Sequence, residues 1–420
     1  MTSDTPDTAF VWIWLPNETE PVVAGRLDQQ GEEIVFTYGQ SYLGRTEAIP
    51  LSRFELPLVS GRQPPLLNLM MAGCIRDSSP DAWGRRVIIN KTLGQKGQDV
   101  DPVILSELTY LLESGSDRIG SLDFQVSASE YIPRQTQQAS LDELQESAER
   151  VQKGIPLSPE LDLALAHGTS IGGARPKAML EEGVVKYIAK FSSQSDPYNV
   201  VKGEFVAMRL AAICGLDVAN VKLTQAMEKD VLLVERFDRY FTGSAWTRKL
   251  MQSALTLLQL DDMTARYASY EDLADIIRKD FASPIETLKE LFSRLVFNIL
   301  CGNTDDHARN HAAFWDGANY KLTPAYDICP QNRTGNETGQ AMLISGNVNA
   351  SKLTTCVAAA QRFLIDEIHA REIIDGQVHC IQNHWDSVCE EANLNEVDRN
   401  FFWKRQFLNP FAFQGFRDSH

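Results

Sequence analysis

The segment that most constrains the fold is residues 301–327, in which three oxygen-bearing side chains have a spacing suited to chemistry on a phosphate group. Asp305 is followed five positions later by Asn310, and Asp327 comes after two short predicted strands. Phosphoryl transfer needs a carboxylate beside the attacking hydroxyl and oxygen ligands that hold Mg²⁺ on the nucleotide phosphates. The spacing D-x-x-x-x-N followed by a further Asp supplies both, although D-x-x-x-x-N alone also fits an ordinary polar loop.

The residues around this segment predict a helix, a loop and a hairpin as its scaffold. The run Ser-Pro-Ile-Glu at 283–286 is typical of a helix start. Apolar residues then recur at helical spacing up to Gly302, which can end the helix in a left-handed conformation. Asp-Gly between two apolar runs at 314–322 predicts a hairpin, whose loop can exceed two residues. We therefore expect Asp305 to follow a buried helix and to face a cleft.

A second cluster, at residues 170–191, predicts a phosphate-covering turn followed by a strand. Gly172 and Gly173 would let backbone amides approach phosphate oxygens, although two glycines alone are a weak signal. The run Tyr-Ile-Ala-Lys-Phe at 187–191 predicts a half-buried strand with Lys190 near its end. Such a lysine can hold nucleotide phosphates, and the alternative is a surface lysine whose stem covers apolar side chains.

The segments that follow keep the order of a protein kinase. Glu204 opens an apolar helical pattern, where it could pair with Lys190. The apolar run at 231–234 predicts a buried strand, and Glu235 and Phe237 follow it where a kinase hinge meets adenine. This order carries more weight than any single motif. It predicts an α+β protein with a two-lobed protein-kinase-like fold, in which the N-terminal lobe is strand-rich and the C-terminal lobe is mostly helical.

Five motifs spread along the chain point to one family. They read T-S-I-G-G-A-R-P-K at 169–177, Y-I-A-K-F at 187–191, V-E-R-F-D-R at 234–239, G-N-T-D-D-H-A-R-N at 302–310 and L-T-P-A-Y-D-I at 322–328. Together they resemble the HipA family of bacterial serine/threonine protein kinases, which are toxins of type II toxin–antitoxin modules. The N-terminal segments 54–58, 77–81 and 118–122 look like that family as well, so the resemblance extends over most of the chain.

The resemblance implies roles for individual residues. Asp305 would be the catalytic base, while Asn310 and Asp327 would bind Mg²⁺. Ser170 would be a regulatory autophosphorylation site, with Thr169 as a second candidate acceptor, because a phosphate there would repel the phosphates of ATP. The full set expected to bind ATP is Ile171, Gly172, Gly173, Ala174, Lys190, Glu235, Phe237, His307, Asn310 and Asp327. His307 is also expected to brace the catalytic loop by hydrogen bonding.

The resemblance also implies partners and marks two departures. The expected protein substrate is a translation component such as an aminoacyl-tRNA synthetase, and the expected regulator is a small DNA-binding antitoxin. Members of the family often carry Gln-Glu-Asp after the hinge, whereas here Gln252 is followed by Ser253 and Ala254. Arg175 and Pro176 stand where the best-known toxin type has Gln and Glu. The chain is therefore expected to be a divergent member with its own substrate and antitoxin contacts.

Composition restricts the location and the partners of the chain. The formal net charge of −16 argues against direct binding of nucleic acid, so DNA would be reached only through a basic partner. No apolar run approaches the ~20 residues that span a bilayer, and Asp4 and Asp7 replace the basic start of a signal peptide. We therefore expect a cytoplasmic protein without membrane contact. The seven cysteines show no paired metal spacing and are expected to be buried, reduced thiols.

The chain of 420 residues is too long for a single typical core. We expect an N-terminal mixed α/β subdomain at 1–125 and a nucleotide-binding small lobe with the glycine-containing loop at 126–239. A helical catalytic lobe is expected at 240–420. Within it, the segment 332–346 is rich in Gly, Asn and Thr and is a candidate activation-type segment.

Three functions remain open from the sequence. The first is a HipA-like serine/threonine protein kinase toxin that transfers the ATP γ-phosphate to a protein hydroxyl and is regulated at Ser170. The second is a kinase-like enzyme that acts on a small molecule, which the altered segment 252–254 keeps open. The third is an inactive nucleotide-binding repressor partner, which would not need Lys190, Asp305, Asn310 and Asp327 together.

Overall fold

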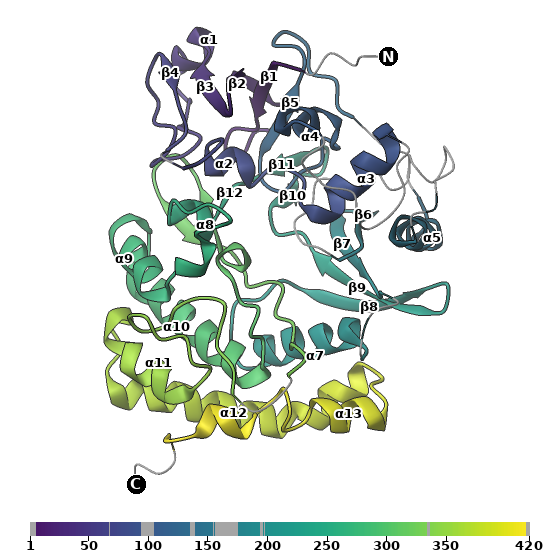
Figure 1. Ribbon diagram of the computed structural model, residues 1–420, viewed down its shortest axis with the longest axis vertical. Coiled ribbons are helices and arrows are strands. Elements are labelled where there is room, and N and C mark those ends of the chain that lie inside the picture. The colour runs from purple at the N-terminus through teal and green to yellow at the C-terminus, as the bar shows by residue number, and fades with distance from the viewer. Residues whose placement is uncertain are drawn as a thin grey trace. The chain divides into compact units, whose positions relative to one another are not determined.

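The computed structural model describes residues 6–66, 68–93, 105–134, 139–153, 155, 175–193, 196, 198–333 and 337–416. The chain groups into two compact units (Figure 1). The first unit comprises Met1–Ser193, Thr224–Gln252 and Trp315–Ala318, and the second comprises Gln194–Leu223, Ser253–Phe314 and Asn319–His420. These groupings divide the sequence differently from the three predicted segments, whose boundaries remain a prediction.

The N-terminal part of the first unit is built on an antiparallel sheet of five strands in the order β4-β3-β2-β1-β5. The strands are β1 (Thr8–Ile13), β2 (Val22–Gln30), β3 (Glu33–Tyr38), β4 (Arg62–Gln63) and β5 (Leu122–Gln125). A register shift between Val11 and Trp12 marks a bulge in β1. β5 begins at Leu122, the last residue of the motif at 118–122, and pairs with β1 at the edge of the sheet.

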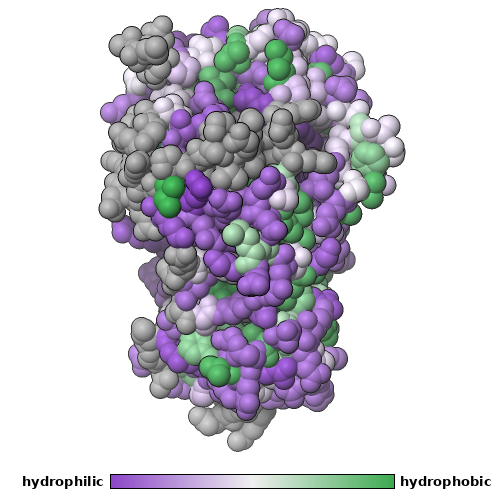
Figure 2. Space-filling model, turned by 90° about the vertical axis from the view of Figure 1, so that its right-hand side faces the viewer, coloured by the Kyte–Doolittle hydropathy of each residue, from purple (hydrophilic) through white to green (hydrophobic). Residues whose placement is uncertain are grey.

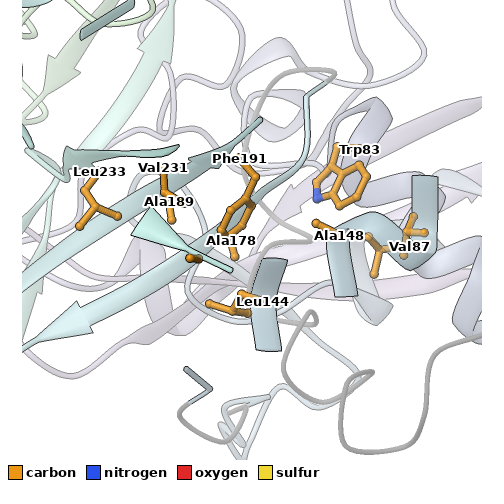
Figure 3. Close-up of a cluster of buried hydrophobic side chains, with 11 residues drawn as sticks. Trp83, Val87, Leu144, Ala148, Ala178, Ala189, Phe191, Val231 and Leu233 are labelled. Atoms are coloured by element: carbon orange, nitrogen blue, oxygen red, sulfur yellow. The ribbon is translucent and has the colours of Figure 1, made fainter. Parts of the chain in front are cut away.

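A second sheet of the first unit has the strand order β6-β7-β9-β8. The strands are β6 (Lys177–Glu182), β7 (Val185–Phe191), β8 (Val221–Ala226) and β9 (Lys229–Glu235). Helices α3 (Ala82–Leu93) and α5 (Leu141–Gln152) cover one face of it (Figure 3). The shared core contains Trp83, Val87, Leu144, Ala148, Val151, Ala178, Ala189, Phe191, Ala226, Val231 and Leu233. A capping box formed by Ser140 and Glu143 starts α5.

The remaining elements of the first unit are short. They are α1 (Gln40–Leu43), α2 (Gly73–Arg76), α4 (Glu107–Glu113), β10 (Arg239–Phe241), β11 (Trp246–Arg248) and β12 (Leu250–Ser253), the last residue of β12 lying in the second unit. Ser106 caps α4 by accepting a hydrogen bond from the Thr109 backbone amide at 3.2 Å. β10 and β11 form a two-stranded antiparallel ribbon directly after the predicted hinge.

The second unit is mostly helical (Figure 1). Its α-helices are α7 (Val200–Ile213), α8 (Ala254–Leu257), α9 (Tyr270–Asp280), α10 (Pro284–Cys301), α11 (Leu353–Ala359), α12 (Glu367–Glu391) and α13 (Glu396–Phe402). Four 3₁₀ turns accompany them: η3 (Ala265–Tyr267), η4 (Ala308–Asn310), η5 (Ala360–Phe363) and η6 (Pro410–Phe413). Strands β13 (Ala312–Trp315) and β14 (Tyr320–Leu322) form the predicted hairpin, whose loop is longer than two residues. The mixture of strand-rich and helical units confirms the predicted α+β fold class.

The surface and the thiols add two observations. On the face shown in Figure 2, hydrophobic residues are scattered among polar ones. Within the described ranges, no helix is long and apolar enough to cross a membrane. All seven cysteines are free, as predicted, but Cys214, Cys329 and Cys380 are only partly buried. The expectation that every thiol is buried is therefore wrong for these three.

Candidate catalytic site

The catalytic loop begins where α10 ends in a left-handed glycine. Gly302 has φ 74°, and a Cβ at this position would lie 2.8 Å from the Gln406 carbonyl oxygen. Only glycine fits both the conformation and the space. Ser283 precedes α10 as predicted, but its side chain makes no capping hydrogen bond. The first turn depends instead on Pro284 and on the Ser283 carbonyl, which accepts from the Thr287 amide at 3.0 Å.

The three predicted catalytic and metal-binding residues come together at this loop. Asn310 is buried and donates its Nδ2 hydrogen to the Asp305 carbonyl at 3.3 Å. Its Oδ1 accepts no hydrogen bond from the described residues, so an oxygen ligand is left over. Asp327 has φ 58°, a conformation that costs energy outside glycine and tends to persist at functional sites. Asn303 donates to the Asp327 carbonyl at 3.5 Å and thereby connects the two segments.

The electrostatic environment of Asp305 fits a general base. Asp305 is an exposed residue. The surrounding protein still removes part of the water around its carboxylate, and this desolvation raises the pKa of Asp305 above its ordinary value. The negative charges of Asp327 and Asp306 raise this pKa further, and His307 opposes them. A base with a raised pKa takes a proton more readily, which suits abstraction of a hydroxyl proton.

Three buried polar side chains, those of Asp306, His311 and Tyr270, contact one another and support the catalytic loop. Asp306 Oδ1 lies 3.0 Å from His311 Nε2, and both side chains are 3% exposed. The Tyr270 hydroxyl, from α9, donates to Asp306 Oδ2 and lies 3.2 Å from the same His311 nitrogen. Burial, followed by the charge of Asp306, raises the pKa of Tyr270, so the phenol keeps its proton and remains a donor. The sequence analysis missed this triad, although the doublet Asp305-Asp306 was a visible signal.

Replacing Tyr270 by Phe should destabilise the second unit without touching the site itself. The change removes a donor from a buried carboxylate, and we expect a loss of about 1–3 kcal/mol in the free energy of unfolding. Urea unfolding of the full chain measures this loss. Tyr267→Phe is the matched control because Tyr267 is exposed, and it should leave stability nearly unchanged. Equal losses in the two variants would mean that the hydroxyl group of Tyr270 adds nothing to the free energy of unfolding and that only its ring stabilises the unit.

Lys190 lies on the face of the second sheet that points away from the hydrophobic core under α3 and α5. Its neighbours Ala189 and Phe191 point into the core beneath α3 and α5 (Figure 3), and side chains alternate along a strand. Lys190 therefore projects from the opposite face. Lys177 is its cross-strand partner, but Lys177 is almost fully buried and paired with Asp81 at 3.2 Å. The role of Lys190 toward the nucleotide phosphates remains a prediction.

The predicted hinge follows β9 and is fixed by a buried ion network. Glu235 and Phe237 are partly buried and alternate with Arg236 and Asp238, which are almost fully buried. Arg236 Nη2 lies 2.8 Å from Asp238 Oδ2, and Asp238 also accepts from the Gly120 amide at 2.8 Å. Glu235 is the last residue of β9, and Phe237 and Asp238 lie in the turn that follows it.

Asp117 and Arg239 complete the same network. Asp117 pairs with Arg236 at 3.0 Å and with Arg239 at 2.9 Å. Burial opposes ionisation of Asp117 and Asp238, but the surrounding arginines outweigh it and hold the pKa of each carboxyl below its ordinary value. The hinge is therefore anchored to the segment that leads into β5. The two motifs, at 118–122 and 234–239, are far apart in the sequence, and no local pattern relates them.

For several of the predicted site residues, the structure does not test the predicted role. Ser170, Ile171, Gly172, Gly173 and Ala174 lie outside the described residues, as does Thr169. Glu204 is buried in α7, which belongs to the second unit, whereas Lys190 belongs to the first. Their pairing remains a prediction.

His307 contributes to the loop through its backbone. Its carbonyl accepts from the Asn310 amide at 2.8 Å, which closes the turn η4. The buried Nδ1 of the His307 side chain has no hydrogen-bond partner among the described residues. The predicted bracing therefore involves the carbonyl, and the ring nitrogen is left for another contact.

Two protein-family models match this chain and show the family to which it belongs. A family model described as the HipA-like C-terminal domain matches residues 169–385, which is just over half of the 420 residues. The chain belongs to the HipA-like kinase family. A second model, the HipA N-terminal domain, matches residues 16–125. The two matches confirm the resemblance that the motifs indicated.

Individual relatives agree with this assignment. A putative kinase, Y4mE, of Sinorhizobium fredii is 26% identical over 320 residues, covering 72% of this chain and 73% of the relative. The serine/threonine-protein kinase toxin HipA of Shewanella oneidensis is 27% identical over 186 residues, covering 38% of this chain and 42% of the toxin.

A solved structure shows the same fold. The chain matches a Shewanella oneidensis structure of a HipA, HipB and operator DNA complex with a TM-score of 0.69. The identity is 17%, and the match covers 96% of this chain and 97% of the other. Because the identity is low, this likeness concerns the fold.

The residues present fit a magnesium–nucleotide ligand. Among the described residues, no group of three or more His, Cys, Asp and Glu side chains is arranged to hold a metal ion. Asn310 and Asp327 offer two oxygen-ligand positions, and Mg²⁺ commonly takes its remaining ligands from water and substrate phosphates. The chemistry of these two side chains, an amide oxygen and a carboxylate, favours this arrangement. Asn310 and Asp327, which both belong to the second unit, would hold the ion.

Proposed function

We propose that this HipA-like kinase is a serine/threonine protein kinase toxin, which transfers the γ-phosphate of ATP to a protein hydroxyl. The observation that carries the proposal is the convergence of Asp305, Asn310 and Asp327 on one buttressed loop. Asp305 accepts the hydroxyl proton, and Lys190 offsets phosphate charge. Bound Mg²⁺ supplies charge neutralisation of the nucleotide phosphates.

Regulation and partners follow from the family and its relatives. We propose that Ser170 is an autophosphorylation site and that the substrate is a translation component such as an aminoacyl-tRNA synthetase. The Shewanella complex contains HipB and operator DNA, which supports a small DNA-binding antitoxin as a partner here. The net charge of −16 supports DNA contact through that partner alone. Phosphorylation of such a substrate would arrest growth.

Phosphate transfer can be tested directly. Purified protein is incubated with γ-labelled ATP and Mg²⁺, alone and with bacterial lysate, and labelled residues are mapped by mass spectrometry. Label on Ser170 and on a serine or threonine of one lysate protein is the expected result. Label only in small molecules would favour the small-molecule kinase. Nucleotide binding without any label would favour the inactive repressor partner.

The segment 252–254 gives no further support to the small-molecule alternative. Gln252 donates its Nε2 hydrogen to the Leu51 carbonyl at 2.7 Å and is fully buried. Ser253 caps α8 by accepting from the Thr256 amide at 3.3 Å. Ser253 therefore has a structural contact where the family resemblance would place an acidic side chain.

The raised pKa of Asp305 predicts the acid limit of activity. The base works only when ionised, so activity should fall as pH drops through a value above the ordinary ~3.9 of an aspartate. Carboxyl ¹³C NMR of Asp-labelled protein measures the titration, and Asp305→Asn assigns the resonance. A midpoint at or below ~3.9 would contradict the proposed desolvation of this side chain.

A further inference from the structure

Arg333 is a buried cation without an anionic partner in the described chain. Its exposed fraction is 6%, and Nε, Nη1 and Nη2 make no hydrogen bond to the described residues. A guanidinium carries five N–H donors and stays charged, so burial without an acceptor is unfavourable. Burial lowers the pKa of Arg333, which agrees with the lack of a compensating carboxylate nearby.

Arg294 shows what a satisfied buried arginine looks like in the same unit. It is 2% exposed and pairs with Glu290 at 2.7 Å. It also donates to the carbonyls of Asp217 and Thr323 at 3.0 and 2.9 Å. The difference indicates that Arg333 is arranged for an acceptor that comes from outside.

The segment that carries Arg333 is attached to the catalytic loop at both ends. The Gln331 amide donates to the Gly302 carbonyl at 3.0 Å, and the Ala341 amide donates to the Thr304 carbonyl at 3.1 Å. Gln340 Nε2 donates to the Asn303 carbonyl at 3.0 Å. Arg333 follows Gln331 by two residues, so its Cα lies at most about 7 Å from that anchor.

We propose that Arg333 is an oxyanion receptor beside the catalytic loop that binds the phosphoryl group of a phosphorylated serine or threonine side chain. A planar guanidinium pairs with two oxygens of such a group, and a phosphoryl group brings close to two negative charges. The receptor would hold phosphorylated protein segments at the site where phosphate is transferred. This source of the group rests on the proposed protein kinase function, whereas anion binding itself can be measured without catalysis.

Thermal unfolding of the full chain tests the receptor. Wild type, Arg333→Met, Arg294→Met and Lys190→Met are compared in a buffer low in oxyanions, and then with added inorganic phosphate, phosphoserine or acetate. Without phosphate, Arg333→Met should unfold at the same temperature as wild type or higher, because an unpartnered buried charge is removed. Phosphate and phosphoserine should raise the unfolding temperature of wild type but not of Arg333→Met.

The other variants separate the alternatives. The unfolding temperature of Lys190→Met should still rise when phosphate is added. This result would show that the added phosphate does not act by binding where Lys190 would contact the phosphates of the nucleotide. Arg294→Met should lower the unfolding temperature in every buffer and keep the response. Destabilisation of Arg333→Met as large as that of Arg294→Met, or an unchanged phosphate response, would overturn the receptor. If acetate raised the unfolding temperature as much as phosphate does, the ligand of Arg333 would be a carboxylate and the proposed phosphoryl group would be wrong. A failed kinase assay would leave these measurements unaffected.

Discussion

Asp305→Ala is expected to reduce phosphoryl transfer by about 10²–10⁴-fold while leaving the fold intact, because a positioned general base contributes an effect of that size. The side chain is exposed, so its removal should cost little stability. Single-turnover labelling with γ-labelled ATP measures the rate, and urea unfolding measures the stability. The loss should concern the rate of transfer rather than binding of the nucleotide.

Asp386→Ala provides the matched control for this variant. Asp386 is an exposed aspartate of α12 in the same unit, so its replacement should change neither rate nor stability. Retention of full activity in Asp305→Ala would refute its role as the base. Parallel loss of activity and stability would instead mean that the variant misfolds.

Asp238→Ala should cause the largest loss of stability, about 3–5 kcal/mol, because it leaves buried positive charge uncompensated. Asp238 is 2% exposed and lies 2.8 Å from Arg236 and 2.9 Å from Arg239. The pKa of Asp238 lies below its ordinary value, so its stabilisation is present above the unfolded-state pKa and is lost as pH falls through the folded-state value. Urea unfolding at neutral pH measures the difference in free energy.

A surface pair and a double variant serve as controls for this prediction. Arg45 and Glu47 lie 2.7 Å apart but are both exposed, so Glu47→Ala should have little effect. Combining Asp238→Ala with Arg236→Met should recover part of the loss, because one unpaired charge is removed together with its partner. A loss no larger than that of Glu47→Ala would show that the network contributes nothing net.

Local chemistry explains what could be predicted from the sequence. The end of α10 at Gly302, the hairpin of β13 and β14 and the capping box of α5 all depend on residues a few positions apart. The same holds for Asp305 and Asn310, which are five positions apart. Residues that are only a few positions apart determine the local backbone geometry by themselves. The fold class and the catalytic loop could therefore be predicted from such patterns.

Contacts between distant segments could not be predicted in the same way. Asp238 pairs with the Gly120 amide 118 residues earlier, and no local pattern relates the two. Tyr270 lies 36 residues before Asp306, and neither periodicity nor spacing marks it as a partner. Arg333 was part of a segment noted for its composition, and only the burial of its side chain set it apart. These features depend on tertiary packing.

The two compact units are interleaved along the chain, and this limits how the protein can be divided. The chain passes from one unit to the other after Ser193, Leu223, Gln252, Phe314 and Ala318. No single truncation point therefore yields a fragment that contains one whole unit and nothing of the other. The first unit cannot be complete until the chain has been synthesised up to Ala318, and the second unit cannot be complete until the C-terminal segment has followed. Fragments bounded by the two family matches, residues 16–125 and 169–385, would each contain only part of a unit. The core of each unit must therefore wait during synthesis for segments that are distant in the sequence.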